Sequence, residues 1–382
     1  MKNLFSLPNI YVLFWALYYT QGTIIPQGSI WSRGILVAFM LISLYFLIKV
    51  LGRKQNPYFK ALGTLLLMFT VYGVAHIFAG GGVGYLQMIY LSLLPIYTFY
   101  ILAREGKINE GWIRIVFFVA VGVVMVQYVS YVRHLEETLM EAENATINVG
   151  YDIVALLPLI YFFKKKPIVQ YVILALVVGL VVTTVKRGAI IVSAFCTLYF
   201  IYNTLTHSTR KTKWYVWMVV LAFVIIGARY VINFYNNSDF AQMRMANTME
   251  GESSGRDSIF AGAWEIFVSS NIIGILFGHG AGATIRIMGI AAHNDWFEIL
   301  VNQGLLGITV YLFYWIAFYK TFRRDKNQET KPIMGTVMMI YFLATLFSMS
   351  YSAMTMPSTL ALGFVLAKQN NNNTLFINNV KE

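Results

Sequence analysis

The stretch "VVTTVKRGAIIV", residues 181–192, has Lys186 and Arg187 side by side within a long apolar region. Residues 168–185 and residues 188–206, on either side of the pair, are both apolar. Each segment is long enough to cross a hydrocarbon layer about 30 Å thick as an α-helix. The stretch therefore predicts two membrane-spanning helices, joined by a connection of only a few residues that carries two cations.

The composition of the whole chain supports this prediction. Of its 382 residues, 58% are hydrophobic and only 12% are charged, and the mean hydropathy is +0.62. These values lie far outside the range of a soluble domain of this length. They predict an all-α, polytopic integral membrane protein in which residues 1–382 form a single membrane domain. The net charge of +12 has to be divided between two membrane faces, so we expect no nucleic-acid partner.

Apolar runs separated by charged or Gly/Asn-rich breaks predict about twelve spanning helices. Their predicted limits are 9–27, 34–51, 59–79, 84–103, 112–132, 150–163, 168–185, 188–206, 214–233, 295–319, 333–350 and 352–367. The sixth and the last of these runs are short for a membrane span.

Lysine and arginine collect in alternate connections, which predicts that these connections and both termini are cytoplasmic. The clusters are Arg53/Lys54/Lys60, Arg104/Lys107/Arg114, Lys164/Lys165/Lys166, Arg210/Lys211/Lys213 and Lys320/Arg323/Arg324/Lys326/Lys331. Lys186 and Arg187 then lie at the outer end of the seventh helix, where cations are disfavoured. One interpretation is a pair that extends its charges to the membrane surface. We favour the other, a fixed anion site, because the connection is too short to form a domain.

One long outer loop is predicted between the ninth and tenth helices, at about residues 236–293. Within it, the apolar residues of "IFAGAWEIFVSS", residues 259–270, recur at helical spacing and predict an interfacial helix that acts as a lid or rim. Arg256 comes just before this helix. It is either an exposed loop arginine or a second cation of the anion site.

The segment "FGHGAG", residues 277–282, is a weak nucleotide motif, because no Lys-Ser/Thr follows it and no strand precedes it. We expect a flexible re-entrant turn there and assign His279 a structural role. In the following segment Asn294 or Asp295 can cap the tenth helix, and His293 stands immediately before it. A helix N-terminus favours anions and disfavours an imidazolium, so His293 is predicted to be a neutral base.

The "KRG" at a helix end, the long outer loop with an arginine, and the segments "FGHGAG" and "AHNDWFEILVNQGLLG" together resemble the superfamily of O-antigen ligases and O-antigen polymerases. These are glycosyltransferases of the bacterial envelope. The match is strong over about residues 181–310, and topology and length extend it loosely to the whole chain. The arginines match by location alone. Tyr151 and Asp152 depart from the simpler helix start expected there, so they receive no role.

The resemblance implies an all-helical bundle in the bacterial inner membrane, with its active site under the outer loop on the extracytoplasmic face. The implied donor is an oligosaccharide on undecaprenyl diphosphate, and its glycan moves to an acceptor hydroxyl without a metal or another cofactor. Arg187 and Arg256 would hold the diphosphate and His293 would deprotonate the acceptor. Lys186 and Asn294 would contribute to substrate binding. Membrane lipids and other polysaccharide-assembly proteins are the further partners it implies.

The residue types agree with this division of labour. Guanidinium groups stabilise the charge that develops on a leaving diphosphate, and a histidine base is worth ~10²–10⁴-fold in rate. Three functions remain open: a repeat-unit polymerase, a ligase that transfers the glycan to a lipid A-core or similar anchor, and a flippase or other transporter. We favour the polymerase, because nothing in the sequence specifies a core-oligosaccharide acceptor. The transporter is disfavoured, because the two halves show no repeat and the charges gather at the outer surface.

Overall fold

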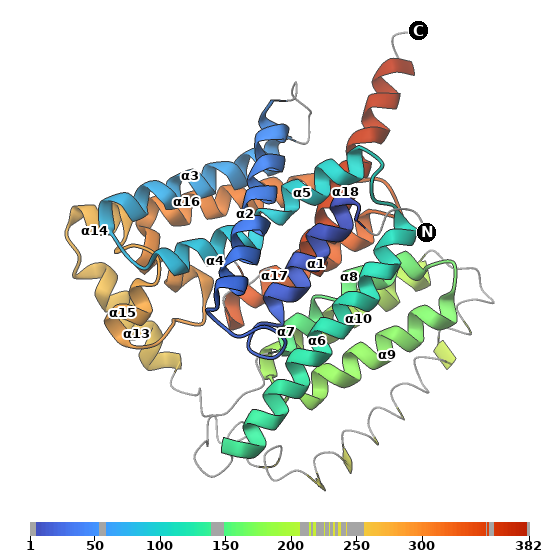
Figure 1. Cartoon of the computed structure of the whole chain (residues 1–382), viewed down its shortest axis with the longest axis horizontal. Helices are drawn as coiled ribbons and strands as arrows, with labels where there is room; N and C mark the ends of the chain where they lie inside the picture. Colours follow the sequence, from blue (N-terminus) through green and yellow to red (C-terminus); the bar gives the residue numbers. More distant parts are fainter. Residues whose placement is uncertain are drawn as a thin grey trace.

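The computed structural model describes residues 5–52, 59–138, 149–206, 256–348, 350 and 355–379, together with isolated residues between 214 and 242. Within these residues the chain forms helices and no strand, as Figure 1 shows. Six helices are long and apolar enough to cross a membrane. The predicted fold class, an all-α membrane protein, is therefore confirmed. The count of about twelve spans stays a prediction, and most of the predicted span 214–233 lies outside the described residues.

The first half of the chain contains α1 (Leu7–Tyr19), α2 (Ile30–Leu51), α3 (Phe59–Ala79), α4 (Val83–Leu93), α5 (Pro95–Arg104), α6 (Glu110–Thr138), α7 (Gly150–Val154), α8 (Leu157–Ile160), the 3₁₀ turn η1 (Tyr161–Phe163) and α9 (Pro167–Thr183). The second half contains α10 (Arg187–Thr206), α13 (Arg256–Val268), α14 (Ile272–Phe277), α15 (Ala283–Met288), α16 (Asp295–Arg324), α17 (Lys331–Phe347) and α18 (Met356–Asn379).

The predicted span 150–163 is wrong as one continuous helix. It is divided into α7, α8 and η1. Pro158 lies in the first turn of α8, and because proline has no N–H it cannot donate the helical hydrogen bond to the carbonyl four residues earlier. The predicted span 84–103 contains α4 and α5, with Pro95 at the start of α5. Together they form one apolar helical run, Val83–Arg104, that is long enough to cross a membrane.

The predicted span 295–319 is also interrupted, at Gly304, whose φ of 66° and ψ of −162° are not helical. The two segments of α16, residues 295–303 and 305–324, lie alongside each other in antiparallel directions. A Cβ on Gly307 would contact Ile299, and the Tyr311 hydroxyl donates to Asp295 Oδ2 at 2.6 Å. Gly304 therefore forms the turn of a helical hairpin, and the segment 295–303 carries its N-terminus roughly 13 Å back along the bundle.

The glycine-rich segment 277–282 holds this turn. The backbone N–H groups of His279 and Gly280 donate to the carbonyls of Val301 and Asn302, each at 2.9 Å. They replace the helical bonds that those carbonyls lose at the break. A side chain on Gly280 would overlap the Gly80 carbonyl at the end of α3. The glycines therefore allow close backbone packing between this segment, α3 and α16.

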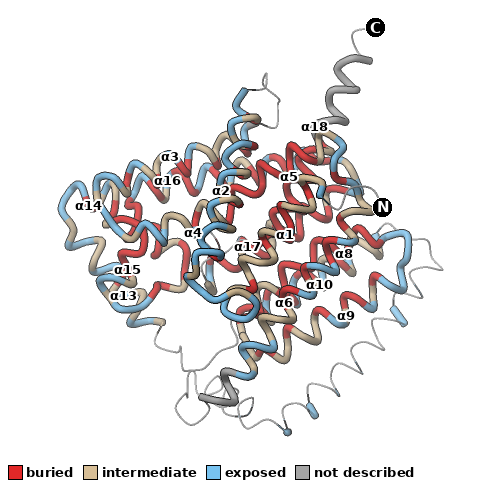
Figure 2. The backbone as a smooth tube through the Cα atoms, viewed as in Figure 1, coloured by how far each residue is buried: buried red, intermediate tan, exposed pale blue. Residues whose placement is uncertain are grey.

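The buried core lies mainly between α5, the first part of α18 and the helices around them, whereas α2, α9 and α10 carry exposed residues that alternate with buried ones (Figure 2). Most exposed residues on these helices are apolar, among them Ile48, Leu176 and Leu198. An apolar surface of this kind suits contact with lipid and would be unfavourable in water.

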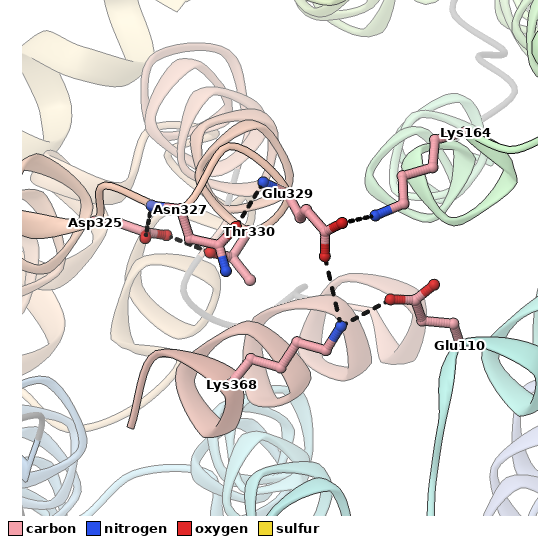
Figure 3. Close-up of polar contacts among 7 residues, drawn as sticks. All are labelled: Glu110, Lys164, Asp325, Asn327, Glu329, Thr330 and Lys368. Atoms are coloured by element: carbon pink, nitrogen blue, oxygen red, sulfur yellow. Dashed lines mark hydrogen bonds and ion pairs between the residues drawn. The ribbon is translucent and has the colours of Figure 1, made fainter. Parts of the chain in front are cut away.

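Ion pairs connect four parts of the chain at one end of the bundle (Figure 3). The Lys368 Nζ of α18 lies 2.7 Å from Glu110 Oε1 of α6 and 4.0 Å from Glu329 Oε2, just before α17. Glu329 also pairs with Lys164, which follows η1. The network ties the start of α6 and the start of α17 to α18, on the end of the bundle that bears several of the basic clusters.

Candidate functional site

The connection between α9 and α10 is as short as predicted, since only residues 184–186 separate the two helices. The Thr184 hydroxyl donates to the Val181 carbonyl at 2.7 Å. Val185 has a φ of 51°, which is uncommon for a β-branched residue and indicates a constrained turn. Lys186 and Arg187 follow it, half-buried, at the N-terminus of α10.

The short helix α7 packs against this turn. A Cβ on Gly150 would lie 2.8 Å from Thr184 Oγ1 and 3.2 Å from Lys186 Cβ. The next residue, Tyr151, places its hydroxyl over Gly188, so that any side chain at position 188 would overlap it. The glycine of the "KRG" sequence therefore makes room for Tyr151.

The predicted helix is present as α13, and Arg256 is its first residue. Its position at the membrane interface stays a prediction. The Arg256 Nη2 donates to the carbonyl of Phe347, the last residue of α17, at 3.4 Å. On the other side, Phe260 stacks on Phe297 with the ring centroids 5.0 Å apart, while Trp264 is half exposed. The helix thus covers the first segment of α16 and ties Arg256 to the end of α17. Most of the predicted loop before residue 256 lies outside the described residues.

Asn294 caps α16, as the sequence predicted. Its Oδ1 accepts from the backbone N–H groups of Trp296 at 3.0 Å and Phe297 at 3.3 Å. The side-chain oxygen is therefore occupied by the helix, and a direct contact of Asn294 with substrate stays a prediction. His293 is half-buried with a φ of 51°, so the chain turns sharply just before the cap.

Burial lowers the pKa of His293 below its ordinary value, and the charges of Lys186 and Arg256 lower it further. The two cations come from the starts of α10 and α13, far apart in the sequence, yet both act on one imidazole. The structure thus brings together Lys186, Arg256 and His293, with Arg187 next to Lys186 in the chain. A neutral imidazole surrounded by cations can accept a proton, while the cations can bind an anion beside it.

A buried carboxylate, which the sequence did not single out, supports the loop before His293. Glu298 Oε2 accepts from the Ala292 N–H at 2.7 Å, and its Oε1 accepts from Asn302 Nδ2 at 3.0 Å and from the Thr284 hydroxyl. Asp295, also buried, accepts from the Ser350 N–H at 2.7 Å. Glu298 thus holds the backbone next to His293, and Asp295 ties the start of α16 to the segment after α17.

Other residues that sequence reasoning missed are Tyr151 and the Phe347 carbonyl. The glycine directly after the two cations leaves space for a neighbouring side chain, but the sequence does not indicate that this side chain is Tyr151. His279 has the contacts of a structural residue: its Nε2 lies 2.6 Å from Ser270 Oγ, and its carbonyl accepts from Arg286 Nη2 at 2.6 Å.

An apolar groove of about 680 Å³ lies between α10, α16 and α17. Phe195, Tyr199, Trp315 and Leu343 are among its lining residues. Leu343 is one helical turn from Phe347, whose carbonyl accepts from Arg256. The groove therefore runs along α10, whose first residue is Arg187, and along α17, whose last residue contacts Arg256.

Among the described residues, no three His, Cys, Asp or Glu side chains gather as a metal site would require. No protein-family model matches the chain, and no curated protein matches it.

Proposed function

We propose that this chain is a membrane glycosyltransferase that transfers an oligosaccharide from undecaprenyl diphosphate to an acceptor hydroxyl on the extracytoplasmic face. One observation carries the proposal: Lys186 and Arg256 act on a single half-buried histidine whose pKa they help to lower. A base and an anion site next to each other are what this transfer needs.

In the transfer, the acceptor oxygen attacks the anomeric carbon of the donor glycan and forms the new glycosidic bond. The bond between that carbon and the diphosphate oxygen breaks, and the diphosphate leaves with the electron pair. His293 takes the acceptor's proton. Arg187 and Arg256, with Lys186, hold the leaving diphosphate, and the N-termini of α10, α13 and α16 add their positive ends.

The shape of the bundle supports a lipid-borne donor. Helices α9 and α17 have 17 residues each, so each is about 25 Å long and shorter than the hydrocarbon layer. Their ends at Thr183 and Phe347 would lie near the outer boundary of the hydrocarbon layer, close to the depth of a lipid headgroup. The apolar groove of about 680 Å³ between α10, α16 and α17 is a suitable place for an isoprenoid chain.

The proposed topology has about twelve spans, with both termini in the cytoplasm. The ion-pair network around Lys368 then lies on the cytoplasmic side, and Arg256 and His293 lie on the outer side. We further propose that the acceptor is a second lipid-linked repeat unit, which makes the protein a polysaccharide polymerase. A ligase would share the donor chemistry and use a lipid A-core or another anchor as its acceptor.

The test uses the purified protein in lipid nanodiscs with lipid-linked repeat units as the only substrate. A polymerase should produce a ladder of longer glycans, and Arg187→Ala and Arg256→Ala should each abolish most of the product while the protein stays folded. Arg187→Lys should restore only part of it, because a point charge cannot make the bidentate contact. Arg286→Ala, which removes a cation that contacts His279 instead, is the control.

Product that forms only after an anchor acceptor is added would identify a ligase. Movement of the lipid-linked unit across a bilayer without any new glycosidic bond would identify a transporter and contradict the proposal.

A further inference from the structure

The Tyr151 hydroxyl is buried, and no group within the described part of the chain hydrogen-bonds it. Tyr151 belongs to α7, which is held against the start of α10 by the close approach of Gly150 to Thr184 and Lys186. The position of the hydroxyl is thus set by the fold of the helices around it.

The surroundings of this hydroxyl are those of the cation site. The oxygen lies over Gly188, the residue directly after Arg187, and the Phe347 Cβ approaches the same glycine. The Phe347 carbonyl accepts from Arg256 Nη2, and the charge of Arg256 acts on the Tyr151 hydroxyl. The oxygen therefore lies between the start of α10 and the guanidinium of Arg256.

A hydroxyl in such a place needs a reason, because a buried polar group without a partner destabilises a protein. A phenylalanine at position 151 would fill the same space over Gly188 without this penalty. The oxygen adds nothing to the packing of the empty protein, and its place among cations suits a contact with a bound molecule. Next to Lys186, Arg187 and Arg256 that molecule is an anion, and a neutral O–H group donates well to a phosphate oxygen.

We propose that Tyr151 is a further substrate-binding residue that donates its hydroxyl hydrogen to a phosphate oxygen of the lipid diphosphate. The inference rests on the proposed function, since that function supplies the diphosphate. It also assigns a role to Gly188, because any side chain there would push the Tyr151 ring out of the site.

The test compares Tyr151→Phe with the wild type in nanodiscs and uses undecaprenyl diphosphate as the probe. The dissociation constant should rise about 10- to 100-fold, the effect of losing one hydrogen bond to a charged group. The melting temperature of the ligand-free protein should stay the same or increase, because an unsatisfied hydroxyl has been removed. Tyr171→Phe is the matched control. Tyr171 packs against Phe200, far along α10 from the cation site, and its substitution should leave the probe affinity unchanged.

A structural role for Tyr151 would instead lower the melting temperature together with the affinity, and this result would overturn the inference. So would an unchanged affinity in Tyr151→Phe when the wild type binds the probe, and in that case the proposed function would stand. A wild type that does not bind undecaprenyl diphosphate would overturn both.

Gly188→Ala gives a second test. If it folds, it should weaken binding, and adding Tyr151→Phe to it should weaken binding little more.

Discussion

The Tyr311 hydroxyl lies 2.6 Å from Asp295 Oδ2, although the two residues are 16 positions apart within one helix, α16. In a straight α-helix this separation would be about 24 Å. The contact exists because the helix turns back at Gly304, and the turn carries His293 to the ends of α10 and α17. The geometry of the candidate site thus depends on the backbone clamp around the glycine-rich segment.

Two glycines with similar positive φ angles offer a matched test of this clamp. Gly280 has a φ of 85° and Gly289 a φ of 76°, so an alanine at either position is strained by about 1–2 kcal/mol. Only at Gly280 would the new Cβ also overlap a backbone atom, the Gly80 carbonyl, whereas nothing lies within 4 Å at Gly289. Gly280→Ala should therefore lower the melting temperature in detergent clearly more than Gly289→Ala. Equal losses would mean that the clamp does not hold the hairpin.

The sequence predicts those parts of the fold that depend on neighbours in the chain. Asn294 caps α16 with contacts two and three residues away, and such a signal is readable locally. The hairpin at Gly304 is different. Residues 295–319 are mostly apolar and predict one continuous span, whereas the donors that replace the broken helical bonds come from His279 and Gly280. The hydropathy of a segment does not indicate hydrogen-bond donors that come from more than 20 residues away.

The candidate site also has parts that the sequence predicts and parts that only the fold reveals. Lys186 and Arg187 stand out in the sequence because they interrupt an apolar run. Two other contacts depend on helix packing between distant segments. Arg256 contacts Phe347 at the end of α17, and Tyr151 covers Gly188. The sequence could name the cations, but it could not reveal the tyrosine that lies among them.

Reporter fusions test the orientation on which every site assignment depends. Reporters fused within residues 207–213 and 321–331 should be active in the cytoplasm, because basic residues cluster at both places. Reporters fused within residues 236–292 should be active outside. Each position should be fused to a cytoplasmic reporter and to an extracytoplasmic reporter, so that a negative result with one is checked by the other. An outer signal from residues 321–331 would reverse the orientation and place Arg256 and His293 on the wrong face for the proposed donor.

The pH dependence of transfer should report the cations next to His293. Burial, Lys186 and Arg256 all lower the pKa of this imidazole, so the neutral base should persist below the ordinary value of about 6.5. Wild-type transfer should therefore decline only at a pH below that value, as the imidazole becomes protonated. Lys186→Gln removes one of the two charges, which raises the pKa and should move the acid limb to higher pH.

The control for this shift is Arg286→Gln, because Arg286 lowers the pKa of His279 and should leave the acid limb in place. The pH profiles of kcat/KM are compared, because this quantity reports the pKa of the ligand-free enzyme, to which the shift of His293 belongs. A limb that stays in place or moves to lower pH in Lys186→Gln would contradict the assignment of His293 as the titrating base.

The sharpest prediction concerns His293 itself. If it removes the acceptor proton in the transition state, His293→Ala should lower the single-turnover rate ~10²–10⁴-fold. Donor affinity should change little, because the groups that hold the diphosphate are untouched. The acid limb should also vanish from the residual activity, since the titrating group is gone.

His279→Ala should affect the rate far less and the melting temperature more, because His279 contacts Ser270 and Arg286 within the outer loop. If His293 served only to support the loop before α16, donor affinity and folded protein would instead decline in proportion to the rate. Binding of undecaprenyl diphosphate and the single-turnover rate, measured on one His293→Ala preparation, separate these outcomes. A normal rate with an intact fold would leave the transfer without its proposed base.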